Sequence, residues 1–246
     1  MPDLFYFDNP VPKSGLPLFD SHAHIHYPDF DIDRTQVIDR AKQAGLTAIV
    51  CIGTHYEDSI KALKVAKDNP EYVYATVGNH PYYADQTSSK CIKDFKDLIL
   101  CNPDLIVGIG ETGLDYFKSP VDRKIQQDSF TEHCLLAKEF NLPVIIHLRE
   151  FSDCFEDALR ILKETDTKKA IFHCYTGDLE SAKLIWAKGY KTSFGLIVNY
   201  PKNSDLRQIY NACPPEFKLH ETDSPYLPPH DKRGQRNEPS FLADYF

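Results

Sequence analysis

The sequence predicts a single-domain (β/α)8 barrel, or TIM barrel, that spans residues 1–246. Eight short apolar runs rich in β-branched residues alternate with amphipathic segments along the chain. The length also fits, because a barrel of eight βα units typically needs about 250 residues. Several of the runs lead directly into a histidine or a carboxylate, and active sites of barrels form where the strands end.

The predicted strands are largely apolar runs, as expected for strands buried on both faces of a parallel sheet. Glycine ends three of them, at Gly53, Gly78 and Gly110. The two patterns nearest the C-terminus are the weakest. The predicted strands cover residues 16–20, 47–52, 72–77, 105–109, 143–147, 170–173, 190–194 and 217–221.

The intervals between these runs carry apolar residues at helical spacing, such as Ile92, Phe95 and Ile99. Gly45 and Gly189 follow two of the segments where glycine commonly ends a helix. The predicted helices cover residues 33–43, 59–67, 88–100, 121–140, 152–162, 179–188 and 205–212.

The alternative fold is a doubly wound open sheet with a nucleotide site. That fold expects a glycine-rich loop after the first strand. Here the first run is followed by Ser21, His22, Ala23 and His24. The barrel is therefore favoured.

Charge and composition restrict the classes of protein that fit. The chain has 36 acidic and 28 basic residues, a formal charge of −8, which disfavours extended binding along duplex nucleic acid but allows contact with a few phosphates. Its seven cysteines include no Cys-x-x-Cys pair, which indicates a reducing compartment. No segment resembles a signal peptide or a membrane span. We therefore expect a cytoplasmic protein without a membrane partner.

Residues of metal-ligand type follow or end the predicted strands. His22 and His24 are two positions apart, so on a strand both imidazoles leave the same face. The C-terminal ends of barrel strands converge on one side of the molecule, where groups from different strands can meet. Six groups at equivalent positions predict a metal site rather than packing. They are His22, His24, Glu111, His147, His173 and Asp223.

The size of this set predicts two divalent cations. Four histidines and two carboxylates exceed the three protein ligands of an ordinary catalytic zinc. A carboxylate can bridge two cations about 3.5–4 Å apart, and Glu111 on a middle strand is best placed to do so. Asp223 would bind one cation and take a proton from the attacking water. Glu111 and Asp223 are therefore the predicted catalytic residues, and the cations can be Zn²⁺, Mg²⁺ or Mn²⁺.

Six motifs resemble those of the TatD family of metal-dependent deoxyribonucleases, which belongs to the amidohydrolase-like barrels. They are FDSHAH at 19–24, VGNHP at 77–81, GETGLDY at 110–116, HCYTG at 173–177, ETDSPYL at 221–227 and RNEP at 236–239. The resemblance covers nearly the whole chain. It implies a TIM barrel, two divalent cations and hydrolysis of DNA phosphodiester bonds as a 3′–5′ exonuclease. The implied partner is DNA, in single strands or at 3′ ends.

The resemblance also implies how the ligands are divided between the cations. One cation is assigned to His22, His24, Glu111 and Asp223, and the other to Glu111, His147 and His173. At its family position, His80 would contact a substrate phosphate; the alternative is that it only caps the third strand. Arg149 lies two residues beyond His147 and can pair with a phosphate or with a neighbouring acid.

The chain departs from the family pattern at two places. Lys118 stands in the region where the family often has arginine, so the charge is kept but the bidentate fork for phosphate is lost. Residues 238–246 allow barely two helical turns, where family members continue with a full closing helix. We therefore expect a short or truncated eighth helix, or another subunit that covers this flank.

Two other functions stay open at this point. The same site can hydrolyse another bond, such as a lactone, an amide or the ester of a mischarged tRNA, as a D-aminoacyl-tRNA deacylase or a small-molecule amidohydrolase does. A non-enzymatic metal-binding protein would instead have a closed site without an open coordination position.

Overall fold

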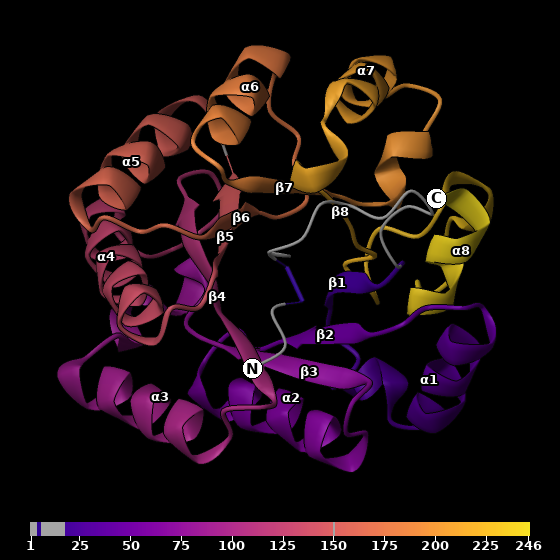
Figure 1. The fold of residues 1–246 in the computed structure, drawn as a ribbon, viewed down its shortest axis with the longest axis horizontal. Coiled ribbons are helices and arrows are strands. Elements are labelled where there is room, and N and C mark those ends of the chain that lie inside the picture. The colour runs from indigo at the N-terminus through magenta and orange to yellow at the C-terminus, as the bar shows by residue number, and fades with distance from the viewer. Residues whose placement is uncertain (1–3, 6–17, 150) are drawn as a thin grey trace.

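Eight parallel strands form one sheet within the residues described by the structure, a computed structural model that covers residues 4–5, 18–149 and 151–246 (Figure 1). The strands pair in chain order from β1 to β8. Their bounds are β1 Asp20–Ala23, β2 Ile49–Ile52, β3 Val73–Val77, β4 Ile106–Asp115, β5 Val144–Arg149, β6 Ala170–Phe172, β7 Lys191–Phe194 and β8 Lys218–His220. The predicted barrel is confirmed.

The barrel closes between β1 and the residues that follow β8. The backbone N–H of Asp223 donates to the carbonyl of His22 over 2.9 Å, and the N–H of His24 donates to the carbonyl of Ser224 over 2.7 Å. These bonds join residues some 200 positions apart in the chain. They also bring the side chains of β1 next to that of Asp223.

Helices surround the barrel and follow the strands in turn (Figure 1). Their bounds are α1 Arg34–Gln43, α2 Tyr56–Asp68, α3 Ser89–Cys101, α4 Arg123–Phe140, α5 Phe151–Glu164, α6 Leu179–Ala187, α7 Ser204–Ala212 and α8 Leu242–Tyr245. The last helix is short, as expected. None of the helices in the described residues is long and apolar enough to cross a membrane.

The C-terminal segment is tied to α1 by ion pairs. Arg236 forms two 2.7 Å contacts with the carboxylate of Asp33. Glu238 contacts Arg40 over 2.6 and 2.8 Å. These pairs hold the C-terminal segment beside α1.

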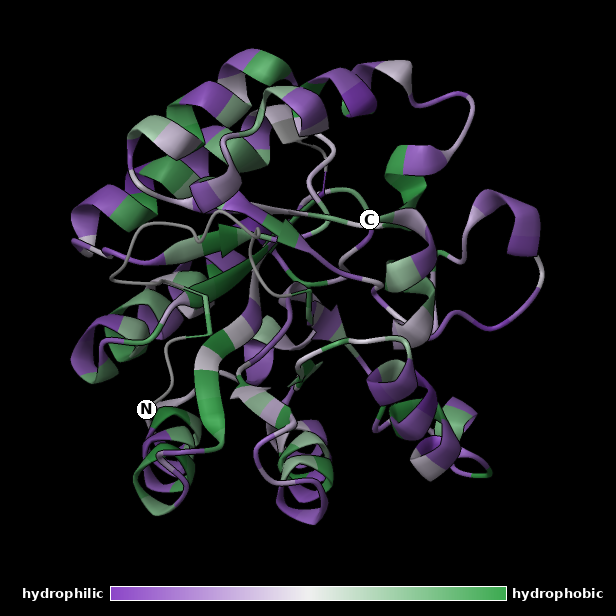
Figure 2. Ribbon diagram, turned by 45° about the vertical axis from the view of Figure 1, so that its right-hand side comes forward, coloured by the Kyte–Doolittle hydropathy of each residue, from purple (hydrophilic) through white to green (hydrophobic). Residues whose placement is uncertain are grey.

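Apolar side chains fill two layers, one between the sheet and the helices and one inside the barrel. Figure 2 shows the apolar residues gathered on the strands and on the helix faces turned toward them. Inside the barrel, Phe5 is 1% exposed and meets Phe19 with ring centroids 6.0 Å apart. Because Phe19 directly precedes β1, Phe5 fills the end of the barrel opposite to the strand C-termini.

Two strands differ from their predicted bounds by more than two residues. The first was expected at residues 16–20, of which 16–17 lie outside the described residues, but pairing with β2 begins at Asp20 and extends to Ala23. His22 therefore lies within β1. The fourth was expected to end at residue 109, but β4 continues to Asp115 and includes Glu111.

A bulge in β4 explains this extension. Ile109 pairs with Val144, but the next pair is Thr112 with Ile146, so β4 contains one extra residue. Gly110 has φ +102°, and a Cβ there would lie 2.6 Å from a carbonyl oxygen of β5. Gly113 has φ +132°, and a Cβ there would lie 2.3 Å from another carbonyl oxygen of β5. Glycine at both positions lets the strand stay paired through the bulge.

Candidate metal centre and active site

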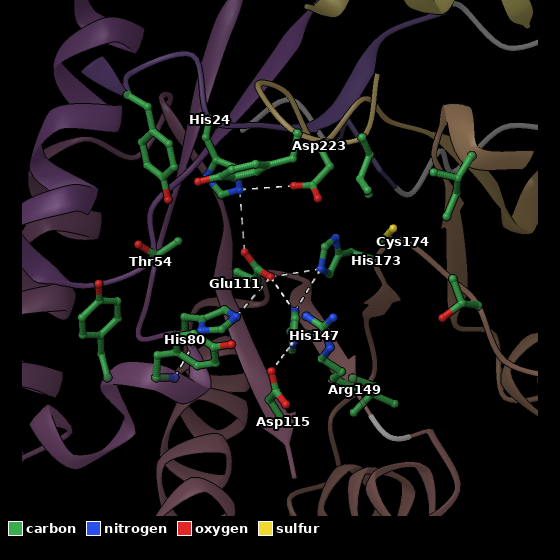
Figure 3. A pocket seen from close by; sticks show the side chains of 18 residues that line it. His24, Thr54, His80, Glu111, Asp115, His147, Arg149, His173, Cys174 and Asp223 are labelled. Atoms are coloured by element: carbon green, nitrogen blue, oxygen red, sulfur yellow. Dashed lines mark hydrogen bonds and ion pairs between the residues drawn. The ribbon is translucent and has the colours of Figure 1, made fainter. Parts of the chain in front are cut away.

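A cavity of about 630 Å³ opens at the C-terminal mouth of the barrel. Figure 3 shows Glu111 near its centre, with His24, His80, His147 and His173 turned toward this carboxylate. Each of these side chains comes from a different strand or from the loop that follows it. The cavity is thus the point where the strand ends converge, as the sequence predicted.

The first group of candidate ligands comes from β1, β4 and the loop after β8. Glu111 Oε2 lies 3.5 Å from His22 Nε2 and 3.8 Å from His24 Nε2. Asp223 Oδ1 lies 3.7 Å and 3.5 Å from the same two nitrogens. Ligands about 2.0–2.1 Å from a tetrahedral zinc are about 3.4 Å from one another, so this spacing suits a cation between them.

The second group surrounds the other oxygen of Glu111. Glu111 Oε1 lies 2.8 Å from His147 Nδ1 and 3.0 Å from His173 Nε2. These two nitrogens are 3.4 Å apart. His80 Nε2 lies 3.6 Å from the same oxygen. The two oxygens of Glu111 therefore face different groups of nitrogens.

Unpaired polar atoms support a role for cations at this site. Both ring nitrogens of His22, which is 1% exposed, lack a hydrogen-bond partner among the described residues. A buried nitrogen without a partner is costly, and a bound cation would satisfy it. The donor set consists of imidazole nitrogens and carboxylate oxygens, which suit zinc and manganese. The residues present therefore fit a metal centre.

Two buried carboxylates lie behind the histidines of the second group. Asp115 Oδ2 is 3.5 Å from His147 Nε2, and Glu221 Oε1 is 3.4 Å from His173 Nδ1. A carboxylate in this position fixes the tautomer and the orientation of a metal-binding histidine. Local sequence patterns predicted a role for neither residue, although Asp115 lies in the motif GETGLDY and Glu221 in ETDSPYL.

Asp20 lies two residues before His22 in β1. Its carboxylate accepts from the backbone N–H of His22 and from the backbone N–H and hydroxyl of Thr222. Asp20 therefore supports the closure between β1 and β8.

The carboxylates of the centre are ionised. Burial by itself would raise the pKa of Glu111, but nearby His173 and hydrogen bonding with His147 hold it well below its usual value. Burial also opposes ionisation of Asp223, but the hydrogen bond with His24 lowers its pKa. Both groups can therefore bind a cation at neutral pH.

The two predicted phosphate contacts differ in charge. Burial lowers the pKa of His80 to about 3, so its ring is neutral at pH 7. Its Nδ1 accepts from the backbone N–H of Tyr82 over 3.2 Å, which leaves Nε2–H as the donor that faces the cavity. Arg149 lies at the exposed end of β5, lines the cavity and supplies a fixed positive charge.

The fold and the site together define a TIM barrel whose active-site mouth gathers the residue types used by metal-dependent hydrolases. A family model described as TatD related DNase matches residues 19–246. The chain therefore belongs to the TatD family.

Related proteins agree with this assignment. The chain is 37% identical over 229 residues to an uncharacterized metal-dependent hydrolase, YabD, of Bacillus subtilis, covering 92% of this chain and 87% of YabD. It is 33% identical over 233 residues to the 3′-5′ ssDNA/RNA exonuclease TatD of Rahnella sp., with coverage of 92% and 86%. The crystal structure of YjjV, a TatD homologue from Escherichia coli K12, has a TM-score of 0.84 and 30% identity, covering 93% of this chain and 87% of YjjV.

Proposed function

We propose that this protein hydrolyses phosphodiester bonds of single-stranded DNA from the 3′ end, with two divalent cations. One observation carries the proposal: the two oxygens of Glu111 face two separate groups of imidazoles, 2.8–3.0 Å away on one side and 3.5–3.8 Å away on the other. The Rahnella relative is named as an ssDNA/RNA exonuclease, which supports the choice of a nucleic acid substrate.

The proposed ligands are those implied by the family resemblance. His22, His24, Glu111 and Asp223 would hold one cation, and Glu111, His147 and His173 would hold the other. When bound, such cations polarise a phosphoryl oxygen and lower the pKa of water.

The protein's own side chains bind the substrate and move the proton. Asp223 is ionised and reaches the cavity, so its carboxylate can accept the proton of the attacking water. His80 can donate from Nε2 to a phosphoryl oxygen, and Arg149 can pair with a phosphate at the mouth.

The first experiment tests the need for metal and the polarity of cleavage. The chelated protein is incubated with single-stranded oligonucleotides labelled at the 5′ or the 3′ end, before and after addition of Zn²⁺, Mg²⁺ or Mn²⁺. We expect no cleavage before addition, and afterwards a ladder of 5′-labelled products. Activity that chelation does not diminish would contradict the proposal, as would cleavage only of esters or amides in a parallel panel.

The second experiment tests the division of the ligands. Replacing both His22 and His24 with alanine should remove one cation and spare the one held by His147 and His173. Glu111→Gln should weaken both sites, whereas Glu156→Gln on the exposed surface of α5 should weaken neither. Elemental analysis of the purified variants measures the metal per chain. Two cations in the double variant would show that the division is wrong.

A further inference from the structure

Exposed aromatic side chains are concentrated at the mouth of the cavity. The chain has 15 phenylalanines, 14 tyrosines and one tryptophan. Among those whose side chains the structure describes, only Tyr82, Phe117 and Tyr226 are exposed, at 36%, 66% and 53%. All three follow the C-terminal ends of strands, after β3, β4 and β8. Exposed aliphatic side chains such as Leu100 and Leu184 lie instead on outer helices.

The two tyrosines are held beside histidines of the site. Tyr226 meets His24 at an interplanar angle of 66°, with centroids 6.3 Å apart. Tyr82 meets His80 at 79° and 4.8 Å. Because the rings meet at steep angles, each contact covers only part of the tyrosine. Each ring therefore has free surface next to the candidate metal centre.

Phe117 lies on the same rim as a positive charge. The guanidinium carbon of Arg149 is 5.8 Å from the centroid of the Phe117 ring. Arg149 also lines the cavity. A flat apolar ring beside a cation matches a nucleotide, which has a flat base and an anionic phosphate.

We propose that Tyr82, Phe117 and Tyr226 stack against unpaired bases next to the cleaved phosphate and so select single-stranded nucleic acid. This inference rests on the proposed nuclease function and names the feature of the substrate that the site recognises. In a duplex the faces of the bases are covered by their neighbours, whereas an unpaired base can present its face to a protein ring.

The negative net charge of the chain makes stacking by the three rings important for binding the substrate. A formal charge of −8 leaves little general attraction for a polyanion. Binding should then depend on the rings and on a few local phosphate contacts. We expect a shallow salt dependence, because the slope of log K against log salt is about −0.7 for each phosphate contacted on a single strand.

The test compares two oligomers with the same number of phosphates, a fluorescein-labelled oligothymidylate and its fully abasic counterpart. Fluorescence anisotropy with the metal-free protein measures binding, and cleavage kinetics with added cation measure KM and kcat. The wild type should bind the oligothymidylate more tightly. Replacing a ring with leucine should weaken that binding by about 5- to 150-fold and leave abasic binding unchanged.

Control variants separate stacking from general surface effects. Tyr82→Phe and Tyr226→Phe keep the ring and should bind like the wild type, and Leu100→Ala on α3 should have no effect. Equal binding of the two oligomers, or leucine variants that bind like the wild type, would overturn the inference. If no cation supports DNA cleavage, the nuclease proposal fails, and the anisotropy data still decide whether the rings bind bases.

Discussion

Gly113→Ala should both destabilise the fold and displace His147. An added Cβ would lie 2.3 Å from the carbonyl oxygen of His147, so the strands must separate by about 0.7 Å to reach the 3.0 Å that real contacts respect. The positive φ of +132° adds backbone strain. We estimate about 1–2 kcal/mol for the strain and about 1–3 kcal/mol for the steric conflict.

The control is Gly189→Ala at the end of α6. Gly189 also has a positive φ, +78°, but an added Cβ would meet nothing within 4 Å. It should therefore cost only about 1–2 kcal/mol of strain. Urea unfolding of the metal-free proteins measures the difference between the two variants.

The same displacement should weaken metal binding. His147 Nδ1 lies 2.8 Å from Glu111 Oε1, and β5 carries this histidine. We expect Gly113→Ala to lower the affinity for one cation by about 10- to 100-fold, as disturbed orientation of a ligand commonly does. Calorimetric titration measures this change. Equal stability losses in the two glycine variants, with unchanged metal affinity, would refute the reasoning.

Three further predictions follow from buried side chains. Glu221→Gln should lower the affinity for one cation by about 10- to 100-fold, because His173 loses its orienting carboxylate; unchanged binding in a calorimetric titration would exclude that role. Burial lowers the pKa of His133 from 6.5 to about 4, so stability present above pH 6.5 should fall by about 3 kcal/mol as the pH drops to 4. When urea unfolding is measured at a series of pH values, His133→Gln should flatten this decrease in stability. A pH profile equal to that of the wild type would mean that other groups cause the decrease. Phe5→Ala should cost about 3 kcal/mol in the same assay, and a loss below about 1 kcal/mol would show that Phe5 does not support the barrel.

Local sequence patterns were sufficient to predict the strand order and to select the six candidate ligands. Each strand is a short apolar run, and the parallel barrel places successive runs side by side. His22, His24, Glu111, His147, His173 and Asp223 could be chosen because each lies at or just after such a run. The structure brings all six together at one mouth.

Local patterns did not locate the bulge in β4, because a bulge is defined by how a strand pairs with its neighbour, here β5. Gly110 looked like the end of a strand, yet pairing with β5 continues to Asp115. The sequence alone also could not distinguish Asp115 and Glu221 from other acids in loops. Each of these two carboxylates lies behind one histidine, Asp115 behind His147 and Glu221 behind His173. Contacts between different strands set these pairs.

The sequence by itself determined the type of fold and the kind of chemistry, since both follow from periodicity and from residue types at strand ends. Only the tertiary structure showed that the two oxygens of Glu111 face different groups of nitrogens, and that Asp115 and Glu221 lie behind two of the histidines. It also showed that the exposed rings of Tyr82, Phe117 and Tyr226 share one rim. The physical reason is that these features depend on distances of a few ångströms between residues far apart in the chain.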